Sequence, residues 1–263
     1  MSIRVHPCFL GLSMKLAKLG DGPEIFHTIQ GEGVSVGAPA VFIRTSRCNL
    51  HCHWCDTDHT WNFEKTPWPH DKDALPGYSK HVKSAVTWEI SPSEAATRIL
   101  SFPCARTVIT GGEPLLQQAE LLEMISHIRA MDTHHAFEVE TNGTRLPSPD
   151  FHAAVDQFNI SPKLANAGMP ENLRLHPASL DFFASSPKAW FKFVVSEIDD
   201  LAEIQALCAR HAIPQSRVLL MPEGRSSSEL DRRAAWLAGL CRDLGFRFSD
   251  RLHIRIWGDQ RGV

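Results

Sequence analysis

The sequence predicts an α/β fold in which strands and helices alternate to form an open or partial (β/α)6 barrel of the TIM type. Short apolar runs alternate with segments of helical periodicity along most of the chain. Polar loops rich in Gly and Pro follow the apolar runs, at TSRCNLHC, TGGEP, ETNG, SPK and MPEG. In such barrels the chemistry lies on the loops at the carboxyl ends of the strands, so these loops are the candidate site.

The strands are predicted from short apolar runs bounded by turn residues. In chain order they cover residues 39–45, 106–110, 136–143, 158–163, 189–195, 217–222 and 251–257. Helical patterns lie between them, at residues 90–100, 115–131, 196–211 and 226–245. Ser91 and Pro92 are typical of a helix start, and Gly245 is typical of a helix end. Short strands that alternate with helices indicate a parallel sheet.

The chain of 263 residues suits one large domain or two small ones. Organised sequence begins near Glu24, so we expect residues 1–23 to be an N-terminal tail, with Met14 as an alternative start. Residues 24–263 are then the barrel domain. Residues 61–88 interrupt the alternation and are rich in Pro, Lys and aromatic residues, which predicts an insertion or lid.

Composition excludes several classes of partner. The formal charge is 27 − 30 = −3, so no basic excess favours direct contact with nucleic acid. No apolar run approaches the roughly 20 residues that span a bilayer, so we expect no membrane association. Four scattered cysteines, Cys8, Cys104, Cys208 and Cys241, are interpreted as buried apolar residues of a cytoplasmic protein without a disulfide framework.

Three further cysteines lie within eight residues, in RCNLHCHWCDTDHTW. Cys48, Cys52 and Cys55 supply three thiolates, and a neighbouring histidine, His51, His53 or His59, would complete a structural zinc site. Alternatively, the three thiolates bind a 4Fe–4S cluster and leave its fourth iron without a protein ligand. An exchangeable position on a metal is a site for chemistry, and in this second interpretation the histidines are ordinary loop residues.

The Cys-x3-Cys-x-aromatic-Cys spacing resembles the signature of the radical S-adenosylmethionine (SAM) superfamily. In that superfamily SAM chelates the open iron, and one electron from the cluster cleaves it to a 5′-deoxyadenosyl radical. TGGEP at 110–114 resembles the second motif of the superfamily. Glycine there is explained by backbone that approaches a ligand closely. The resemblance therefore implies a radical SAM barrel.

EIFHTIQGEGVSVGAPAVFIR, followed by CNLHCHWCDTDHTW, is similar to the 7-carboxy-7-deazaguanine synthase family of the queuosine pathway. The resemblance extends over most of the chain from Glu24 onward. It implies a lyase that contracts the ring of 6-carboxy-5,6,7,8-tetrahydropterin to 7-carboxy-7-deazaguanine with loss of ammonia. SAM, a 4Fe–4S cluster and Mg²⁺ are the implied cofactors. A homodimer and an electron donor such as flavodoxin or ferredoxin are the implied partners.

The resemblance also implies a role for individual residues. The cluster ligands are Cys48, Cys52 and Cys55, and the Mg²⁺ ligand is Thr57. The implied SAM contacts are Trp54, Cys55, Asp56, Gly112, Ser161, Pro162, Lys163, Met221, Pro222, Glu223 and Gly224. The implied substrate contacts are Ile29, Gln30, Gly31, Arg44, Thr110 and Val263. The family often has Gln-Pro where this chain has Met221-Pro222, which is a departure from its pattern.

Two rival functions share some of these features. A radical SAM activase that makes a glycyl radical on a partner protein has the cysteine motif, but it lacks TIQGEG with the downstream Arg44. A zinc-stabilised binding module would have no catalysis and would contain zinc without sulfide. Glu113, Glu138 and Glu140 lie near the motifs, and we expect them to hold the site residues in place without contacting the ligands themselves.

Overall fold

A computed structural model describes residues 12–263, so Cys8 and residues 1–11 of the expected tail lie outside the described part. The longer strands are β1 (Met14–Leu19), β3 (Ile25–Ile29), β4 (Pro39–Thr45), β5 (Thr87–Ile90), β6 (Arg106–Gly111), β7 (Ala136–Thr141), β8 (Gln157–Ile160), β9 (Ala189–Val195) and β10 (Val218–Pro222). Two strands have two residues each, β2 (Gly22–Pro23) and β11 (Arg247–Phe248).

Within the described residues these strands form one open sheet in the order β11-β10-β9-β8-β7-β6-β4-β1-β2, with β3 beside β4 and β5 beside β1. The strands from β4 to β10 along this path pair in parallel, whereas β1 and β3 run antiparallel to β4. This arrangement confirms the predicted α/β class and the partial barrel. The predicted strands from 39–45 to 217–222 are all found, with small shifts at their ends.

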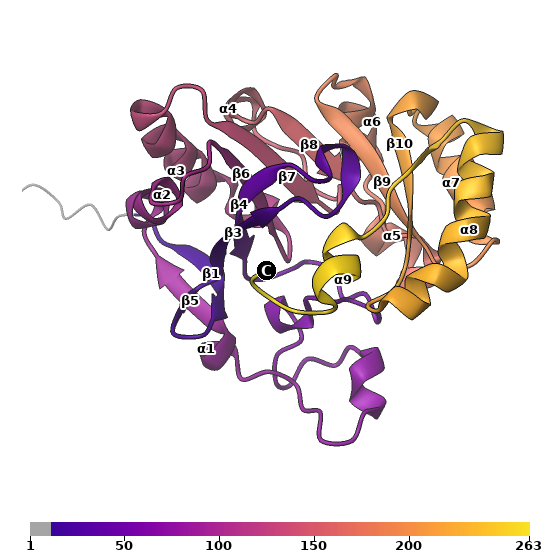
Figure 1. Cartoon of the computed structure of the whole chain (residues 1–263), viewed down its shortest axis with the longest axis horizontal. Helices are drawn as coiled ribbons and strands as arrows, with labels where there is room; N and C mark the ends of the chain where they lie inside the picture. Colours follow the sequence, from indigo (N-terminus) through magenta and orange to yellow (C-terminus); the bar gives the residue numbers. More distant parts are fainter. Residues whose placement is uncertain (1–11) are drawn as a thin grey trace, which may run out of the picture.

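The α-helices are α1 (Lys83–Val86), α2 (Pro92–Leu100), α3 (Gln118–Met131), α4 (Pro149–Ala154), α5 (Glu171–Arg174), α6 (Pro177–Ser185), α7 (Asp200–Arg210), α8 (Ser227–Leu244) and α9 (Leu252–Trp257). Helices α2, α3, α7 and α8 lie along the outer side of the curved sheet, while α9 and the C-terminus lie on its inner side (Figure 1). The core between sheet and outer helices contains fully buried Phe137, Phe158, Phe183, Phe191 and Phe193. Among residues 12–263, no helix is long and apolar enough to cross a membrane.

Single-turn 3-10 helices occupy several loops, at Gly33–Ser35, Asp58–Thr60, Asp71–Ala74, Pro114–Gln117, Ala165–Ala167 and Gln215–Arg217. Helix α7 begins at Asp200 rather than at Ser196, because the Asp200 carboxylate accepts hydrogen bonds from the backbone N–H groups of Ser196 (2.7 Å) and Glu197 (3.1 Å). The preceding turn is therefore stabilised by the side chain of the helix's own first residue.

Two predictions about the ends of the chain are wrong. Ordered structure does not begin near Glu24, because Met14 and Leu16 are fully buried in β1, which pairs with β5 and β4. Residues 251–257 form no strand, because Arg251 turns inward to several acceptors and the segment continues as helix α9. Its alternating apolar residues imitate a strand, but Ile254 alone is fully packed while Ile256 and Trp257 are exposed.

Candidate active site

The loop after β4 brings the three clustered cysteines into one cavity of about 250 Å³. Cys52 is buried and Cys48 and Cys55 are half-buried, and all three pack in one apolar cluster with Leu50 and Met169. The carboxyl ends of parallel strands meet at one edge, so the loops after β6 to β10 line the same cavity. Pro162 is buried between two lining residues and does not face the cavity itself.

Apart from Pro162, every residue predicted for the site lies on the cavity wall. These residues are Ile29, Gln30, Gly31, Arg44, Cys48, Cys52, Trp54, Cys55, Asp56, Thr57, Thr110, Gly112, Ser161, Lys163, Met221, Pro222, Glu223, Gly224 and Val263. They come from strands and loops between Ile29 and Val263, and the fold brings them together.

The cysteine sulfurs lie in surroundings that suit a metal centre. Burial raises the pKa of each thiol, that of Cys52 to about 12, and neighbouring acidic groups add to the effect for Cys48 and Cys55. Hydrogen-bonding groups nevertheless point at the sulfurs. The Leu50 N–H donates to Cys48 Sγ at 3.4 Å, and the Thr57 hydroxyl lies 3.6 Å from Cys55 Sγ. Thiolates with such donors are stable here when a bound cation compensates their charge.

The donor set bears on both metal hypotheses. Structural zinc needs four ligands around one ion. In the described part of the chain, no three His, Cys, Asp or Glu side chains surround a single point in that way. The ligands of a cubane cluster bind different irons, and the three motif thiols line one cavity wall, so this donor set is one that a cluster can use.

The TGGEP segment at the end of β6 is hydrogen-bonded to the backbone that leads into the cysteine loop. The Gly112 N–H donates to Thr45 O at 3.0 Å, and the Glu113 N–H donates to Arg47 O at 2.8 Å. A Cβ on Gly112 would lie 2.0 Å from Arg47 O. Glycine at this position thus has a reason that is independent of any ligand, because a side chain would first meet the backbone of the cysteine loop.

Glu113 connects that segment to the next loop. Its buried carboxylate accepts hydrogen bonds from the Thr141 hydroxyl (2.7 Å) and from the backbone N–H groups of Asn142 (2.7 Å) and Leu115 (3.0 Å). Burial raises the pKa of Glu113 although these donors oppose the effect. The predicted supporting role of Glu113 thus has a structural basis in the link between the loops after β6 and β7.

The TIQGEG segment faces two acidic residues of β7. The buried Gln30 side-chain amide donates to Glu138 at 2.9 Å and to Glu140 at 3.2 Å, and Glu140 also accepts from the Thr110 hydroxyl at 2.8 Å. Gly31 lies against α9, where a Cβ would meet the His253 ring at 2.1 Å. Because Gln30 and Thr110 both donate to the Glu140 carboxylate, they lie next to each other on the cavity wall.

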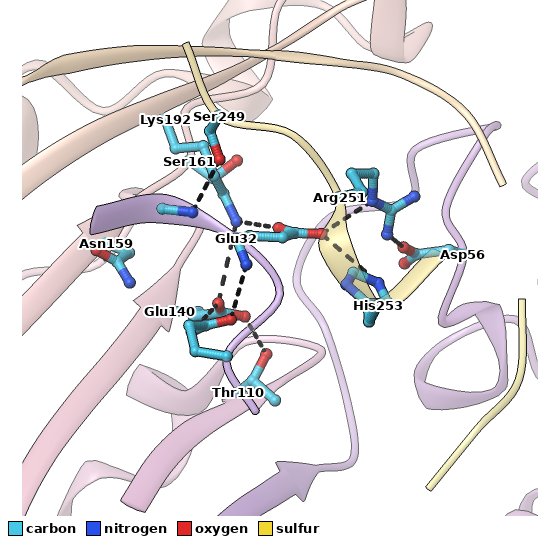
Figure 2. Close-up of polar contacts among 12 residues, drawn as sticks. Glu32, Asp56, Thr110, Glu140, Asn159, Ser161, Lys192, Ser249, Arg251 and His253 are labelled. Carbon is cyan, nitrogen blue, oxygen red and sulfur yellow. Dashed lines mark hydrogen bonds and ion pairs between the residues drawn. The ribbon is translucent and has the colours of Figure 1, made fainter. Parts of the chain in front are cut away.

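A buried ionic network, drawn in Figure 2, joins TIQGEG to the C-terminal segment. Lys192 and Arg251 both pair with Glu32, with Arg251 Nε at 2.9 Å, and Arg251 also pairs with Asp56. Burial alone would raise the pKa of Glu32, but Lys192, Arg251 and His253 hold it well below its usual range. Asp56, predicted as a SAM contact, is thus engaged by Arg251 from the opposite end of the chain.

Sequence reasoning missed Glu32, Lys192, Arg251 and His253 as cavity residues. One signal was present, because Lys192 is a lone cation in the apolar run AWFKFVV and is nevertheless buried. A charge inside a predicted buried strand requires a partner. Its partner Glu32 lies 160 positions away, so the pattern alone does not identify it.

Glu24 anchors both the predicted substrate arginine and the C-terminus. Its fully buried carboxylate pairs with Arg44 Nε at 2.7 Å and with Arg261, and His59 Nε2 lies 3.3 Å away. Burial would raise the pKa of Glu24, but Arg44, His59 and Arg261 lower it well below its usual range. Through Arg261, which also donates to Lys18 O at 2.8 Å, the ion pair places Val263 at the cavity.

We expect Glu24→Gln to lower the free energy of unfolding by about 3 kcal/mol, since Glu24 is fully buried and its loss leaves the half-buried Arg44 without its main counter-charge. Because the folded pKa is depressed, the wild-type pairs stabilise the fold above about pH 4.3, and this contribution is lost progressively as the pH falls further. Urea unfolding at several pH values measures both effects. Glu89→Gln, which removes an exposed pair with Lys15, is the matched control and should leave stability nearly unchanged.

The loop after β8 packs against the aromatic residue of the cysteine motif. Lys163 Nζ donates to Ser161 Oγ at 2.9 Å and lies 5.7 Å from the centre of the Trp54 ring. The Trp54 indole N–H donates to Asn166 O at 2.9 Å.

The loop after β10 is held at the cavity by Arg251, which donates a hydrogen bond to Gly224 O at 2.6 Å. Although the sequence has Met221-Pro222 where the family often has Gln-Pro, both residues still line the cavity.

The loop histidines contact protein groups. His51 stacks on Trp68 with ring centres 3.8 Å apart, and His53 Nδ1 lies 2.7 Å from an Asp71 oxygen. Both partners belong to the predicted insertion, whose His70 Nε2 lies 2.8 Å from Cys55 O. The insertion is thus attached directly to the cysteine loop.

Buried Asp58, just after the cysteine loop, contacts three side chains of the insertion. Its carboxylate accepts hydrogen bonds from Lys72 (2.7 Å) and Tyr78 (2.6 Å) and lies 2.9 Å from His81 Nε2. Residues 58–82 contain single-turn helices, loops and one isolated β-bridge between Phe63 and His81, so these side-chain contacts add to a few backbone hydrogen bonds in ordering the segment. The predicted insertion ends earlier than expected, because α1 and β5 return the chain to the sheet before residue 88.

The chain is similar to proteins of known family. A family described as a 4Fe-4S single cluster domain matches residues 29–158. A protein from Pyrobaculum aerophilum named 7-carboxy-7-deazaguanine synthase is 39% identical over 242 residues, which cover 91% of this chain and 95% of that protein. A protein of the same name from Halobacterium salinarum is 33% identical over 267 residues, covering 91% and 93%.

Among solved structures, the crystal structure of QueE from Escherichia coli has a TM-score of 0.64 and 25% sequence identity, and the match covers 92% of this chain and 95% of that one. Identity of this level over almost the full length of relatives from distant organisms extends well beyond the cysteine motif. The chain therefore belongs to the 7-carboxy-7-deazaguanine synthase family.

Proposed function

We propose that the protein is a carbon–nitrogen lyase, a 7-carboxy-7-deazaguanine synthase that acts in queuosine biosynthesis. It would convert 6-carboxy-5,6,7,8-tetrahydropterin to 7-carboxy-7-deazaguanine and release ammonia. The observation that carries the proposal is a single cavity lined both by the three motif cysteines and by the TIQGEG and Arg44 side chains, in a chain of this family.

Cys48, Cys52 and Cys55 would bind three irons of a 4Fe–4S cluster and leave the fourth iron to SAM. The cluster supplies the electron that cleaves SAM, and SAM supplies the hydrogen-abstracting group. The residues proposed to contact SAM surround the cysteine loop: Trp54, Asp56, Gly112, Ser161, Pro162, Lys163 and Met221 to Gly224. Lys163 beside Trp54 supports this placement, since it puts a cation next to the cysteine loop, where it would suit the carboxylate of SAM.

The substrate would bind between TIQGEG, β4 and the C-terminus. Within the described residues, the Arg44 side chain donates a hydrogen bond through Nε alone, to Glu24. Its two terminal nitrogens are thus available to an anionic or heterocyclic edge of the substrate. Glu140 orients both Gln30 and Thr110. Because the Gln30 amide nitrogen already donates to Glu138 and Glu140, the Gln30 and Thr110 side-chain oxygens are the groups that would accept hydrogen bonds from the substrate. Ile29, Gly31 and Val263 are the further proposed contacts.

Residues 61–88 and the C-terminal segment would shield the reaction from water. The insertion is bound to the cysteine loop by His70 and Asp58, and α9 with residues 258–263 crosses the inner side of the sheet (Figure 1). Such shielding would favour radical chemistry, because water and other quenchers would be kept away from the reacting carbon.

Thr57 is proposed as the protein ligand of Mg²⁺. Its hydroxyl lies on the cavity wall next to the cysteine loop, and Mg²⁺ prefers oxygen ligands and keeps several waters. We expect Thr57→Ala to abolish the stimulation of turnover by Mg²⁺ and to reduce turnover at saturating Mg²⁺ about tenfold. Thr57→Ser, which keeps the hydroxyl, should retain the stimulation. Unchanged metal dependence in Thr57→Ala would remove this residue from the Mg²⁺ site.

One assay tests the function directly. Anaerobically reconstituted protein is incubated with SAM, a reductant, Mg²⁺ and the carboxypterin, and the deazaguanine acid is sought by mass spectrometry. Product that requires all four additions supports the proposal, and about four iron and four sulfide per chain support the cluster. One zinc without sulfide would identify a binding module instead and would end the proposal.

Further parts of the proposal concern partners. A homodimer, and an electron donor such as flavodoxin or ferredoxin, are expected from the family resemblance. A cytoplasmic location is likewise expected, because three of the seven cysteines are proposed as cluster ligands and not as disulfide partners. Light scattering of the purified protein measures the first of these expectations.

A further inference from the structure

Arg225, in the loop after β10, contacts the cysteine loop directly. Its side chain lines the cavity and donates hydrogen bonds through Nη2 to Trp54 O at 3.0 Å and to Cys55 O at 2.6 Å. Nη2 carries two hydrogens, which matches these two acceptors. The two carbonyls flank the Cα of Cys55, so one guanidinium fixes the stretch of backbone from which the Cys55 thiol projects.

The backbone around Arg225 is itself fixed by its neighbours. The Arg225 N–H donates to the Glu229 carboxylate at 2.7 Å, in the first turn of α8, and Arg251 donates to Gly224 O at 2.6 Å. Gly224 has a φ of 153°, and a Cβ there would lie 2.9 Å from the Glu229 Cβ, so the turn requires glycine. A side chain that extends from so constrained a turn can hold another segment in place.

The cysteine loop has few backbone hydrogen bonds of its own at this point. Within the described chain, the N–H groups of residues 52–56 donate two backbone hydrogen bonds, to Cys52 O at 3.1 Å and to Ala167 O at 3.3 Å. His70 Nε2 lies 2.8 Å from Cys55 O and is a second side-chain contact there. The position of this backbone therefore depends on side chains that reach it from other segments.

We propose that Arg225 is a positioning residue, which holds the Cys55 thiol and the Trp54 ring where the cluster and SAM need them. The inference rests on the proposed 4Fe–4S and SAM sites. A charged donor makes a stronger hydrogen bond to a carbonyl than a neutral donor does. Because Trp54 and Cys55 are consecutive, displacement of this backbone would move a cluster ligand and a SAM contact together. The cysteine loop is thus completed by a residue 170 positions further along the chain.

The test compares variants of two arginines. Arg225→Gln removes the guanidinium, and Arg225→Lys keeps the charge but not the fork of N–H groups. Arg217→Gln is the matched control, because Arg217 is also half-buried and also donates to backbone carbonyls, among them Ala189 O at 3.3 Å. Arg217 precedes β10 at the end of the strand opposite to Arg225 and does not line the cavity.

Two measurements on the full chain read out the position of the loop. Hydrogen exchange followed by mass spectrometry reports the opening of the cysteine-loop peptides, before and after anaerobic reconstitution. Loss of iron to a chelator reports how firmly the reconstituted cluster is held. We expect Arg225→Gln to speed both about tenfold, the effect of losing a charged hydrogen bond, and Arg225→Lys to speed both by less. Arg217→Gln should match the wild type in both.

The pattern along the chain separates positioning from general stabilisation. Faster exchange confined to the cysteine loop supports the proposal, whereas an equal rise in the peptides of β6 and β7 overturns it. Wild-type exchange and iron loss in Arg225→Gln also overturn it and leave the proposed function standing. If Arg225→Gln does not fold, wild-type values in Arg225→Lys count against the proposal in the same way. A wild-type protein that assembles no iron and sulfide overturns the proposed function and this inference together.

Discussion

Cys52→Ser should abolish turnover and lower the iron content well below the wild-type value of about four per chain. Cys52 is 6% exposed and packs against Leu50 and Met169 within the cysteine cluster, so a serine there has neither the length nor the softness of the thiolate it replaces. The other described cysteines outside the motif are remote from the cavity lining, so none of them substitutes for it. Cys48→Ser and Cys55→Ser should behave in the same way.

Cys241→Ser is the control for this experiment. Cys241 is as buried as Cys52 but lies in α8, where its thiol approaches Arg247 O at 3.6 Å, a contact that a serine hydroxyl keeps. We expect wild-type iron content and nearly wild-type activity, with a small loss of stability. Anaerobic iron and sulfide analysis beside the activity assay separates the outcomes. An active Cys52→Ser variant would contradict the assignment of the ligands.

Gly112→Ala should destabilise the protein by about 1–3 kcal/mol and prevent SAM-dependent turnover. The new Cβ would lie 2.0 Å from Arg47 O and 2.9 Å from the Cys48 backbone nitrogen. Both neighbours are backbone atoms of the cysteine loop, so the strain is relieved only if that loop moves. Displacement of the loop would misplace Cys48 relative to the other two ligands.

Gly239→Ala is the matched control, since Gly239 lies in α8 and a Cβ there would meet no atom within 4 Å. Alanine in the interior of a helix should raise stability by about 0.5–1 kcal/mol and leave activity unchanged. Urea unfolding of the cluster-free proteins and iron analysis after reconstitution give both readouts. Wild-type stability and turnover in Gly112→Ala would show that the loop accommodates a side chain there.

Local patterns predicted most of the secondary structure and much of the cavity wall. The runs at 39–45 and 189–195 are strands with those bounds, because continuous apolar residues are buried on both faces of a parallel sheet. The helix at 226–245 begins after Ser226 and ends at Gly245, whose φ of 72° suits glycine. The pattern failed at 251–257, where Arg251 is buried by ionic contacts that no local period encodes.

The sequence by itself determined the alternation of strands and helices, the clustering of three thiols after a buried strand, and therefore the chemistry that this cavity can support. These features depend on residues close together in the chain, and local spacing encodes them directly. Only the tertiary structure decided which charges meet at the cavity. Arg251 reaches Glu32 across 219 positions, and Arg261 reaches Glu24 across 237. Ion pairs at such separations arise because the curved sheet brings its two edges and the C-terminal segment around one space, and this closure is a property of the whole fold.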